Sequence, residues 1–143
     1  EVLTPDGWFR TGDLGAVDKH GYLSIRGRLK NMIVGSSGEN IYPEEIESVI
    51  NDFGHVIESL VVQKKGKLVA MVHLNIEELQ AKYAQMKKDF TDQAELIINE
   101  YLEELQRYVN SRVNRYSQLQ LVVYQPEPFQ KTATLKIKRF LYY

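Results

Sequence analysis

The chain contains the stretch Gly38-Glu-Asn-Ile-Tyr-Pro43-Glu-Glu-Ile-Glu47, which predicts where its first helix begins. Proline suits the first position of a helix, since the N–H group that it lacks would have no partner there. The glutamates that follow Pro43 place negative charge at the positive end of the helix dipole. Apolar residues then recur at helical spacing, at Ile46, Val49, Ile50 and Phe53. We therefore expect an amphipathic helix that starts at Pro43 and is stopped by Gly54.

Short strands are expected on both sides of this helix. Before it, residues 22–25 and 32–34 read as strands around a polar break at 26–30, and the flexible loop Gly35-Ser-Ser-Gly38 follows. After it, two runs rich in valine and leucine, 56–63 and 68–74, flank a turn of one glycine and three lysines. This second pair of strands is the strongest hairpin candidate in the chain.

Two helices and a last strand complete the predicted fold. Apolar residues are spaced by three and four between residues 76 and 86, and again between 97 and 116 after a break at 89–92. We expect these two helices to be antiparallel. Residues 119–124 form a last core strand, and the two prolines that follow enforce an extended segment. The order of elements predicts an α+β fold, in which a small β-sheet built from hairpins has helices packed against it.

Length and composition allow one compact domain and argue against several classes of function. The chain has 143 residues, of which 43% are hydrophobic, so it can bury one core. Its 18 basic and 19 acidic residues leave a net charge of −1, which argues against a broad face for nucleic acid. Without cysteine there is no disulfide, thiolate metal site or thiol nucleophile, and a reducing cytoplasm is permitted. No apolar run is long enough to span a membrane, and a first residue that is Glu instead of Met leads us to expect a piece of a longer protein.

Two residues near the start of the chain suit a sugar or a phosphate. Asp13 follows Thr11-Gly12 at the end of an expected strand, where its carboxylate can accept two hydrogen bonds from a ribose diol. Arg28 can offer a fork of donors to a ribose oxygen or a phosphate. Each has a plain alternative when taken alone, because Asp13 also suits a turn and Arg28 a solvated position beside one.

Four motifs follow one another in the chain. They are Gly7-Trp-Phe-Arg-Thr-Gly-Asp13, Gly27-Arg-Leu-Lys30, the stretch 38–47 and the basic segment 130–139. Together they resemble the superfamily of acyl-CoA synthetases, luciferases and peptide-synthetase adenylation domains, over nearly the whole chain. Within this superfamily the chain is most similar to bacterial long-chain fatty acid–CoA ligases. The resemblance implies an AMP-forming acid–thiol ligase and the fold of its small C-terminal lid domain.

The resemblance also implies roles for the residues near the start of the chain. Asp13 matches the aspartate that binds both ribose hydroxyls of the adenylate, and Arg28 matches the arginine that contacts the ribose and the phosphate side. Lys30 matches the hinge about which the small C-terminal domain swings between two orientations. Residues 1–29 would then end the large N-terminal domain, and residues 30–143 would form the mobile C-terminal domain. No metal ligand is expected among these residues.

The loop before the first helix matches a segment that faces CoA. Gly35, Gly38, Glu39 and Asn40 match the loop that lines the pantetheine tunnel in the thioester-forming orientation. We expect a glycine at position 38 because a backbone beside that thin arm leaves little room for a Cβ atom.

Lys136 matches the catalytic lysine of the superfamily. In this motif Leu135 replaces the usual glycine and Gln130 the usual proline. Long-chain members often lack that glycine, so the change favours this subfamily. The alternative is a basic tail in which Leu135 and Ile137 face inward while Lys136 and Lys138 alternate into water.

The implied reaction has two halves. A fatty acid and ATP give an acyl-AMP and pyrophosphate, with Mg²⁺ neutralising the leaving group, and the acyl group then passes to the thiol of CoA. ATP and Mg²⁺ would be bound mainly by the large N-terminal domain, so the 143-residue chain is not expected to be active alone. The resemblance favours a cytoplasmic location and allows peripheral contact with a membrane, and we expect no nucleic-acid partner.

Two other functions stay open at this point. An adenylation domain that loads a carrier-protein thiol would carry the same residues, because the groups that select the acid and the thiol lie mostly elsewhere. A free-standing, non-catalytic interaction module would instead use the helical pair 76–116 to bind a partner.

Overall fold

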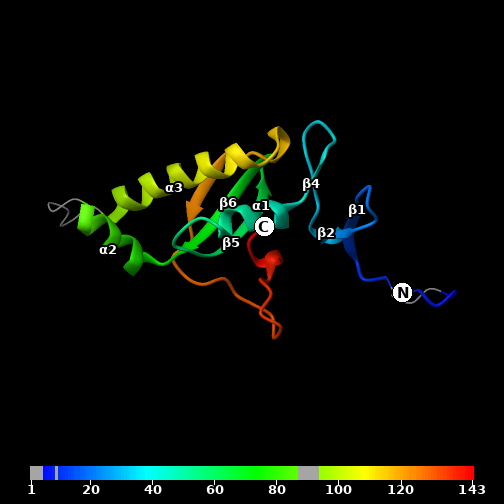
Figure 1. Cartoon of the computed structure of the whole chain (residues 1–143). Helices are drawn as coiled ribbons and strands as arrows, with labels where there is room; N and C mark the ends of the chain where they lie inside the picture. The colour runs from blue at the N-terminus through cyan, green and yellow to red at the C-terminus, as the bar shows by residue number, and fades with distance from the viewer. Residues whose placement is uncertain (1–4, 9, 87–93) are drawn as a thin grey trace.

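The computed structural model describes residues 5–8, 10–86 and 94–143. In this part of the chain, three α-helices and the C-terminal segment pack on a three-stranded sheet, and two small hairpins precede them (Figure 1). The fold is α+β, as the sequence predicts. Within the same residues, no helix combines the length and the apolar character that crossing a membrane requires.

The central sheet contains β5 (Val56–Lys64), β6 (Lys67–Leu74) and β7 (Leu121–Tyr124), in that order. β5 and β6 form the predicted hairpin, which is confirmed. Its turn places Lys65 and Gly66 at φ of 51° and 76°, the left-handed conformation that matches the twist of a tight hairpin. β7 pairs with β6 in parallel, so the chain must cross over the sheet between them, and it does so through two helices.

The two faces of this sheet bury different parts of the chain. One face packs against the helices. The other packs against the C-terminal segment, through a second core made of Leu60, Val62, Val69 and Phe129. Ile137 is half-buried and lies against this second core. The basic segment 130–139 is therefore fixed to the sheet by apolar contacts on the face that the helices leave open.

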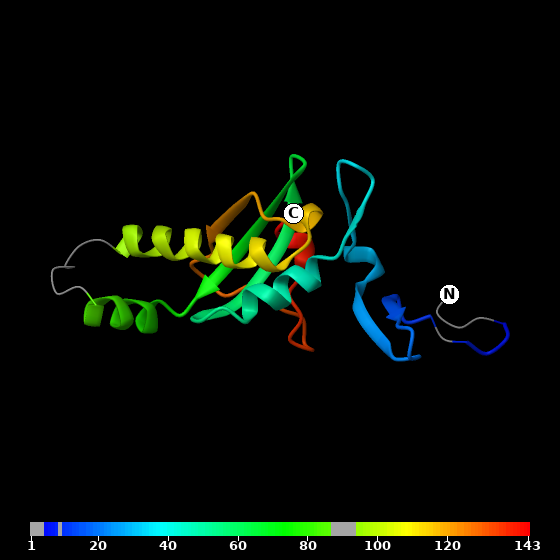
Figure 2. The ribbon, with the colours of Figure 1, turned by 45° about the horizontal axis from the view of Figure 1, so that its top comes forward.

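The helices are α1 (Pro43–Asn51), α2 (Ile76–Met86) and α3 (Ala94–Arg112). α1 begins at Pro43, as predicted, and ends at Asn51 before Gly54 is reached. α2 and α3 lie side by side and run in opposite directions (Figures 1 and 2), as the sequence leads us to expect. The predicted break at 89–92 lies outside the described residues.

α3 ends at Arg112 instead of at residue 116, and a polar side chain explains the difference. The carboxamide oxygen of Asn114 accepts hydrogen bonds from the backbone N–H groups of Tyr116 and Ser117. These bonds cap a separate 3-10 turn, Arg115–Ser117, and so compete with continuation of the helix.

Two hairpins precede α1 and are connected by the 3-10 turn Leu29–Asn31. The first joins β1 (Asp13–Val17) to β2 (Leu23–Arg28), and the second joins β3 (Ile33–Val34) to β4 (Asn40–Ile41). The described residues thus form three separate small sheets where one was expected. In Figure 2 the first hairpin projects to one side of the central sheet, and β2 contacts α1.

Pairing with β1 changes two local predictions. β2 continues through residues 26–28, where the sequence suggested a polar break, because backbone hydrogen bonds do not require apolar side chains. Asp13 begins a strand instead of ending one, and the register places it directly opposite Arg28.

Candidate functional site

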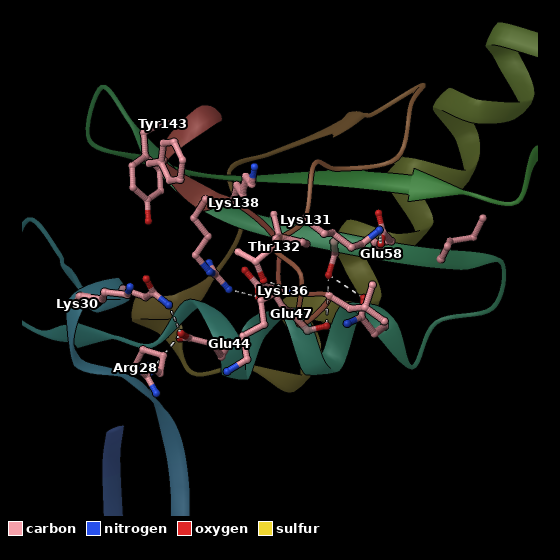
Figure 3. Close-up of a pocket in the computed structure, with 18 residues that line it drawn as sticks. Arg28, Lys30, Glu44, Glu47, Glu58, Lys131, Thr132, Lys136, Lys138 and Tyr143 are labelled. Carbon is pink, nitrogen blue, oxygen red and sulfur yellow. Dashed lines mark hydrogen bonds and ion pairs between the residues drawn. The ribbon is translucent and has the colours of Figure 1, made fainter. Parts of the chain in front are cut away.

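An open pocket of about 720 Å³ lies between the turn Leu29–Asn31, α1, β5 and the C-terminal segment (Figure 3). Six of its lining residues are basic: Arg28, Lys30, Lys131, Lys136, Lys138 and Arg139. Three are acidic: Glu44, Glu47 and Glu58. The pocket therefore brings together three of the residues that the sequence marks, Arg28, Lys30 and Lys136. The loop from Gly35 to Asn40 does not line it.

Arg28 and Asp13 hold each other at the edge of this pocket. The Arg28 guanidinium donates a hydrogen bond to Asp13 Oδ1 over 2.7 Å, as their opposed positions on β1 and β2 allow. The backbone N–H of Asp13 also donates to the hydroxyl of Thr11. The two side chains are 42% and 30% exposed, so the paired guanidinium and carboxylate lie side by side within reach of a polar ligand.

Lys30 occupies the middle of the turn Leu29–Asn31 and is exposed. The residues on either side of it bind one carboxylate of α1. Glu44 Oε1 accepts hydrogen bonds from the backbone N–H of Arg28, at 3.2 Å, and from the side-chain amide of Asn31, at 2.7 Å. The polypeptide on both sides of Lys30 is thus connected to the first turn of α1.

The segment around Lys136 is a tight loop. Residues 131 and 137 pair as an antiparallel bridge, and the backbone N–H of Thr132 donates to the carbonyl oxygen of Lys136 over 2.8 Å. The N–H of Leu135 donates to the carbonyl oxygen of Thr132 over 2.9 Å. Leu135 takes a φ of 63°, so a leucine adopts here the left-handed conformation that glycine adopts most easily.

Leu135 and Ile137 do not face the same way. The side chain of Ile137 packs against the second core, whereas that of Leu135 is 79% exposed. The expectation of a tail in which both residues face inward is therefore wrong for Leu135, because the left-handed turn points its side chain away from the sheet. Lys136 lies exposed between them, and no ion pair joins its amine to any other described residue.

Ion pairs fix this loop at both ends, a partly buried one before it and a more deeply buried one after it. Before it, Lys131 pairs with Glu58, whose other oxygen accepts a hydrogen bond from the backbone N–H of Phe129. After it, Arg139 pairs with Glu47 of α1, and both side chains are at least 85% buried. The position of Lys136 is therefore determined by anchors in α1 and β5, which lie far from it in the sequence.

Glu47 is a carboxylate within the protein interior. Its second oxygen accepts a hydrogen bond from the backbone N–H of Val61 over 2.8 Å. Burial raises the pKa of Glu47 above its ordinary value, and the charge of Arg139 offsets part of that rise. Sequence reasoning counted Glu47 only among the charges that favour the start of the helix and assigned no role to Glu58. The position of Glu47 next to Ile46 and three residues before Ile50 places it on the buried stripe of α1, which was the available signal.

The glycine loop forms the tip of the hairpin β3–β4. The backbone N–H of Gly35 donates to the carbonyl oxygen of Glu39, and Gly38 has a φ of 83°. A Cβ atom at Gly38 would meet no heavy atom within 4 Å. Within the chain itself Gly38 is favoured by its left-handed backbone conformation, and the expected crowding beside the CoA arm stays a prediction.

The Mg²⁺ ion that the sequence resemblance implies does not fit the part of the chain that the structure describes. Among residues 5–8, 10–86 and 94–143, no three histidine or acidic side chains come close enough together to hold a metal ion. Each pocket carboxylate also has a basic or amide partner already.

Replacing Leu135 tests whether its left-handed conformation stores strain. Leu135→Gly is expected to raise the free energy of unfolding by about 0.5–1 kcal/mol, since removing strain exceeds the entropy that glycine adds to the unfolded chain. Urea unfolding measures the change. Leu135→Ala is the matched control, because it removes the exposed side chain and keeps the Cβ atom. Equal stabilisation by both substitutions would show that the backbone is not strained.

No protein-family model matches the chain. Individual proteins do. The long-chain-fatty-acid–CoA ligase FadD13 of Mycobacterium tuberculosis is 51% identical over 71 residues, which are 47% of this chain and 14% of that protein. The 2-methylpropanoate–CoA ligase CCL4 of Humulus lupulus is 31% identical over 139 residues, which are 97% of this chain and 22% of that protein. The chain thus spans less than a quarter of the length of these relatives.

Solved structures share the fold. The Mycobacterium tuberculosis fatty acyl CoA synthetase matches 97% of this chain and 24% of its own, with a TM-score of 0.60 and 31% identity. The O-succinylbenzoate Coenzyme A synthetase MenE of Bacillus subtilis, in complex with ATP and magnesium, matches 96% of this chain and 24% of its own, with a TM-score of 0.68 and 27% identity. The homologues of this chain are AMP-binding acyl-CoA ligases, and its fold is that of the C-terminal domain of adenylate-forming enzymes.

Proposed function

We propose that this chain is the mobile C-terminal part of an AMP-forming fatty acid–CoA ligase and that Lys136 is its catalytic lysine. The proposal rests on which basic side chains of the segment 130–139 have ion-pair partners. Lys131 and Arg139 are both ion-paired, whereas Lys136 between them is exposed and has no ion pair among the described residues. Lys138 also has no ion pair among the described residues, but it is half-buried whereas Lys136 is exposed. A fixed loop that presents an exposed ammonium suits an anionic reactant brought by another domain.

Lys136 would act in the first half-reaction. An oxygen of the fatty carboxylate attacks the α-phosphorus of ATP, the bond to the β-phosphate bridging oxygen breaks, and pyrophosphate leaves. Two anions meet in this step, so an ammonium between the carboxylate and phosphate oxygens stabilises the transition state. In the second half-reaction the CoA thiol loses its proton and attacks the acyl carbon, and AMP leaves.

Asp13 and Arg28 would contact the ribose of the adenylate, with Arg28 also reaching the phosphate side. Their mutual hydrogen bond supports this, since it directs a carboxylate and a guanidinium to one place. The loop containing Gly35, Gly38, Glu39 and Asn40 would contact CoA after the lid has rotated. Its separation from the pocket that contains Lys136 is consistent with two sites that are used in turn.

The division at Lys30 belongs to the same proposal. Residues 1–29 would belong to the large domain, and residues 30–143 would form the lid. The hairpin β1–β2 supports this division, because its apolar side chains Val17, Leu23 and Ile25 are each at least 65% exposed. A large apolar surface without a core of its own suits contact with a further domain.

A fatty acid is the proposed acid substrate. FadD13 supports it through the higher identity of the two named sequence relatives, although over only 47% of the chain. The relative that covers 97% of the chain is a 2-methylpropanoate ligase, so the acid varies among homologues. Because both named relatives are CoA ligases, CoA is favoured over a carrier protein as the acceptor.

Complementation between separate domains tests the proposed function. The 143-residue chain alone should give no ATP–pyrophosphate exchange with a fatty acid, and exchange should appear when the large domain is added. Full ATP–pyrophosphate exchange by the chain alone would contradict the role of a lid. The same holds if the exchange activity of the large domain does not change when the chain is added. Acids of two to sixteen carbons in the same assay would establish the chain-length preference.

Substituting proline for Lys30 tests the hinge. Proline fixes φ near −65° and disfavours helical conformation at the preceding residue, Leu29, which lies in a 3-10 turn. Lys30→Pro in the whole enzyme should slow overall thioester formation at least tenfold, while one of the two half-reactions keeps its rate. Lys30→Ala is the control, since it removes the side chain and leaves φ free. If Lys30→Pro leaves both rates unchanged, the hinge lies elsewhere.

A further inference from the structure

Glu44 links the two sides of the proposed hinge. It is the second residue of α1 and is half-buried. Its Oε1 accepts one hydrogen bond from the backbone N–H of Arg28 and another from the side-chain amide of Asn31 (Figure 3). Arg28 precedes Lys30 and Asn31 follows it. One carboxylate oxygen thus contacts the chain before and after the pivot.

The second oxygen of Glu44 is also closely surrounded by the protein. Glu44 Oε2 is buried and accepts no hydrogen bond from the described residues. It lies against the backbone of Gly27, where an added Cβ atom would come within 2.5 Å of it. A side chain at position 27 would therefore push the carboxylate away. Glycine at this place permits the close approach of Glu44 to β2.

A second contact between β2 and α1 is weaker. Arg26 pairs with Glu45 over 3.2 Å, but both side chains are about half exposed. Exposed ion pairs of this kind contribute little, because water and salt screen them. The contacts of Glu44 are partly buried and involve a charged acceptor, which makes them the stronger connection across Lys30.

We propose that Glu44 is a positioning residue, a clasp that holds the lid in the orientation seen here. The Glu44 clasp comprises its carboxylate, the Arg28 N–H and the Asn31 amide. The inference rests on the proposed hinge at Lys30. When the chain rotates there, Asn31 moves with α1 and keeps its bond, whereas Arg28 moves away and loses it. The Arg28–Glu44 bond therefore favours one orientation over the other and sets how often the enzyme changes between its half-reactions.

The Glu44 clasp is tested by comparing three variants of the whole enzyme in single-turnover measurements of each half-reaction. Glu44→Ala should accelerate, by roughly tenfold, the half-reaction that needs the other orientation. It should leave the half-reaction that uses the orientation seen here unchanged or slower. Glu44→Gln keeps an acceptor oxygen and should show a smaller change of the same sign. Glu77→Ala is the matched control, because Glu77 is also the second residue of a helix and is exposed far from Lys30.

Hydrogen exchange of the peptide that covers residues 27–31 provides a readout that does not depend on activity. Exchange of the Arg28 amide should become faster in Glu44→Ala and stay unchanged in Glu77→Ala. Unchanged exchange in Glu44→Ala would overturn the clasp, and so would equal losses in both half-reactions. Failure of the proposed function gives a different result, because the unsubstituted protein would then perform neither half-reaction. The hydrogen-exchange comparison would still decide whether the Glu44 clasp exists.

Discussion

Lys136→Ala is expected to slow acyl-adenylate formation by about 10²–10³-fold while thioester formation from a supplied acyl-adenylate keeps its rate. Loss of one preorganised charge that stabilises a transition state typically has this effect. The substitution should not disturb the loop, because the bonds that shape it use the backbone and the hydroxyl of Thr132. The amine of Lys136 has no ion-pair partner among the described residues, so its removal leaves no carboxylate there without a counter-charge.

The measurement is pyrophosphate release for the first half-reaction and CoA-dependent consumption of a supplied acyl-adenylate for the second. Lys138→Ala is the matched control, since Lys138 lines the same pocket two residues further on. It should change the first rate much less than Lys136→Ala does. Losses of equal size in both half-reactions would rule out the role proposed for Lys136.

The local elements of the fold were predictable because their signals lie within a few residues. Pro43 with its glutamates specifies where α1 begins, and a glycine between two valine-rich runs specifies the hairpin β5–β6. β1 depends on pairing with β2, and the parallel position of β7 depends on pairing with the distant strand β6, and the residues of one strand do not specify its partner. Asn114 likewise shortened α3 through a cap that the apolar spacing does not reveal.

The candidate site divides in the same way. Motif spacing identified Arg28, Lys30 and Lys136, and the structure places all three around one pocket. Motif spacing could not identify Glu58 as the partner of Lys131, because that ion pair depends on how the C-terminal segment crosses the sheet. The fold also explains how a leucine at position 135 preserves the turn, since the loop bonds hold its backbone in the left-handed conformation.

Arg139→Ala should lower the free energy of unfolding by about 3–5 kcal/mol, because it leaves the buried carboxylate of Glu47 without its counter-charge. The loop around Lys136 would also lose one of its two anchors. Equilibrium urea unfolding at neutral pH measures the effect. Arg107→Ala is the matched control, since Arg107 is exposed on α3 and should change stability by no more than about 0.5 kcal/mol.

The pH dependence of this loss separates buried charge from lost packing. The pKa of Glu47 is raised in the folded protein, so the folded state keeps the proton to higher pH than the unfolded chain, and its contribution to stability falls as pH rises above the ordinary glutamate range. Without Arg139 the pKa rises further, and the fall becomes larger. The stability gap between Arg139→Ala and the unsubstituted protein should therefore widen between about pH 4 and pH 7.

Glu47→Gln combined with Arg139→Ala removes the buried charge and keeps an oxygen that can accept the bond from Val61. The double variant should recover part of the lost stability at neutral pH and should lose most of the added pH dependence. If the single and double variants are equally unstable at every pH, Arg139 stabilises the C-terminal segment through packing, and its charge does not anchor the loop that presents Lys136.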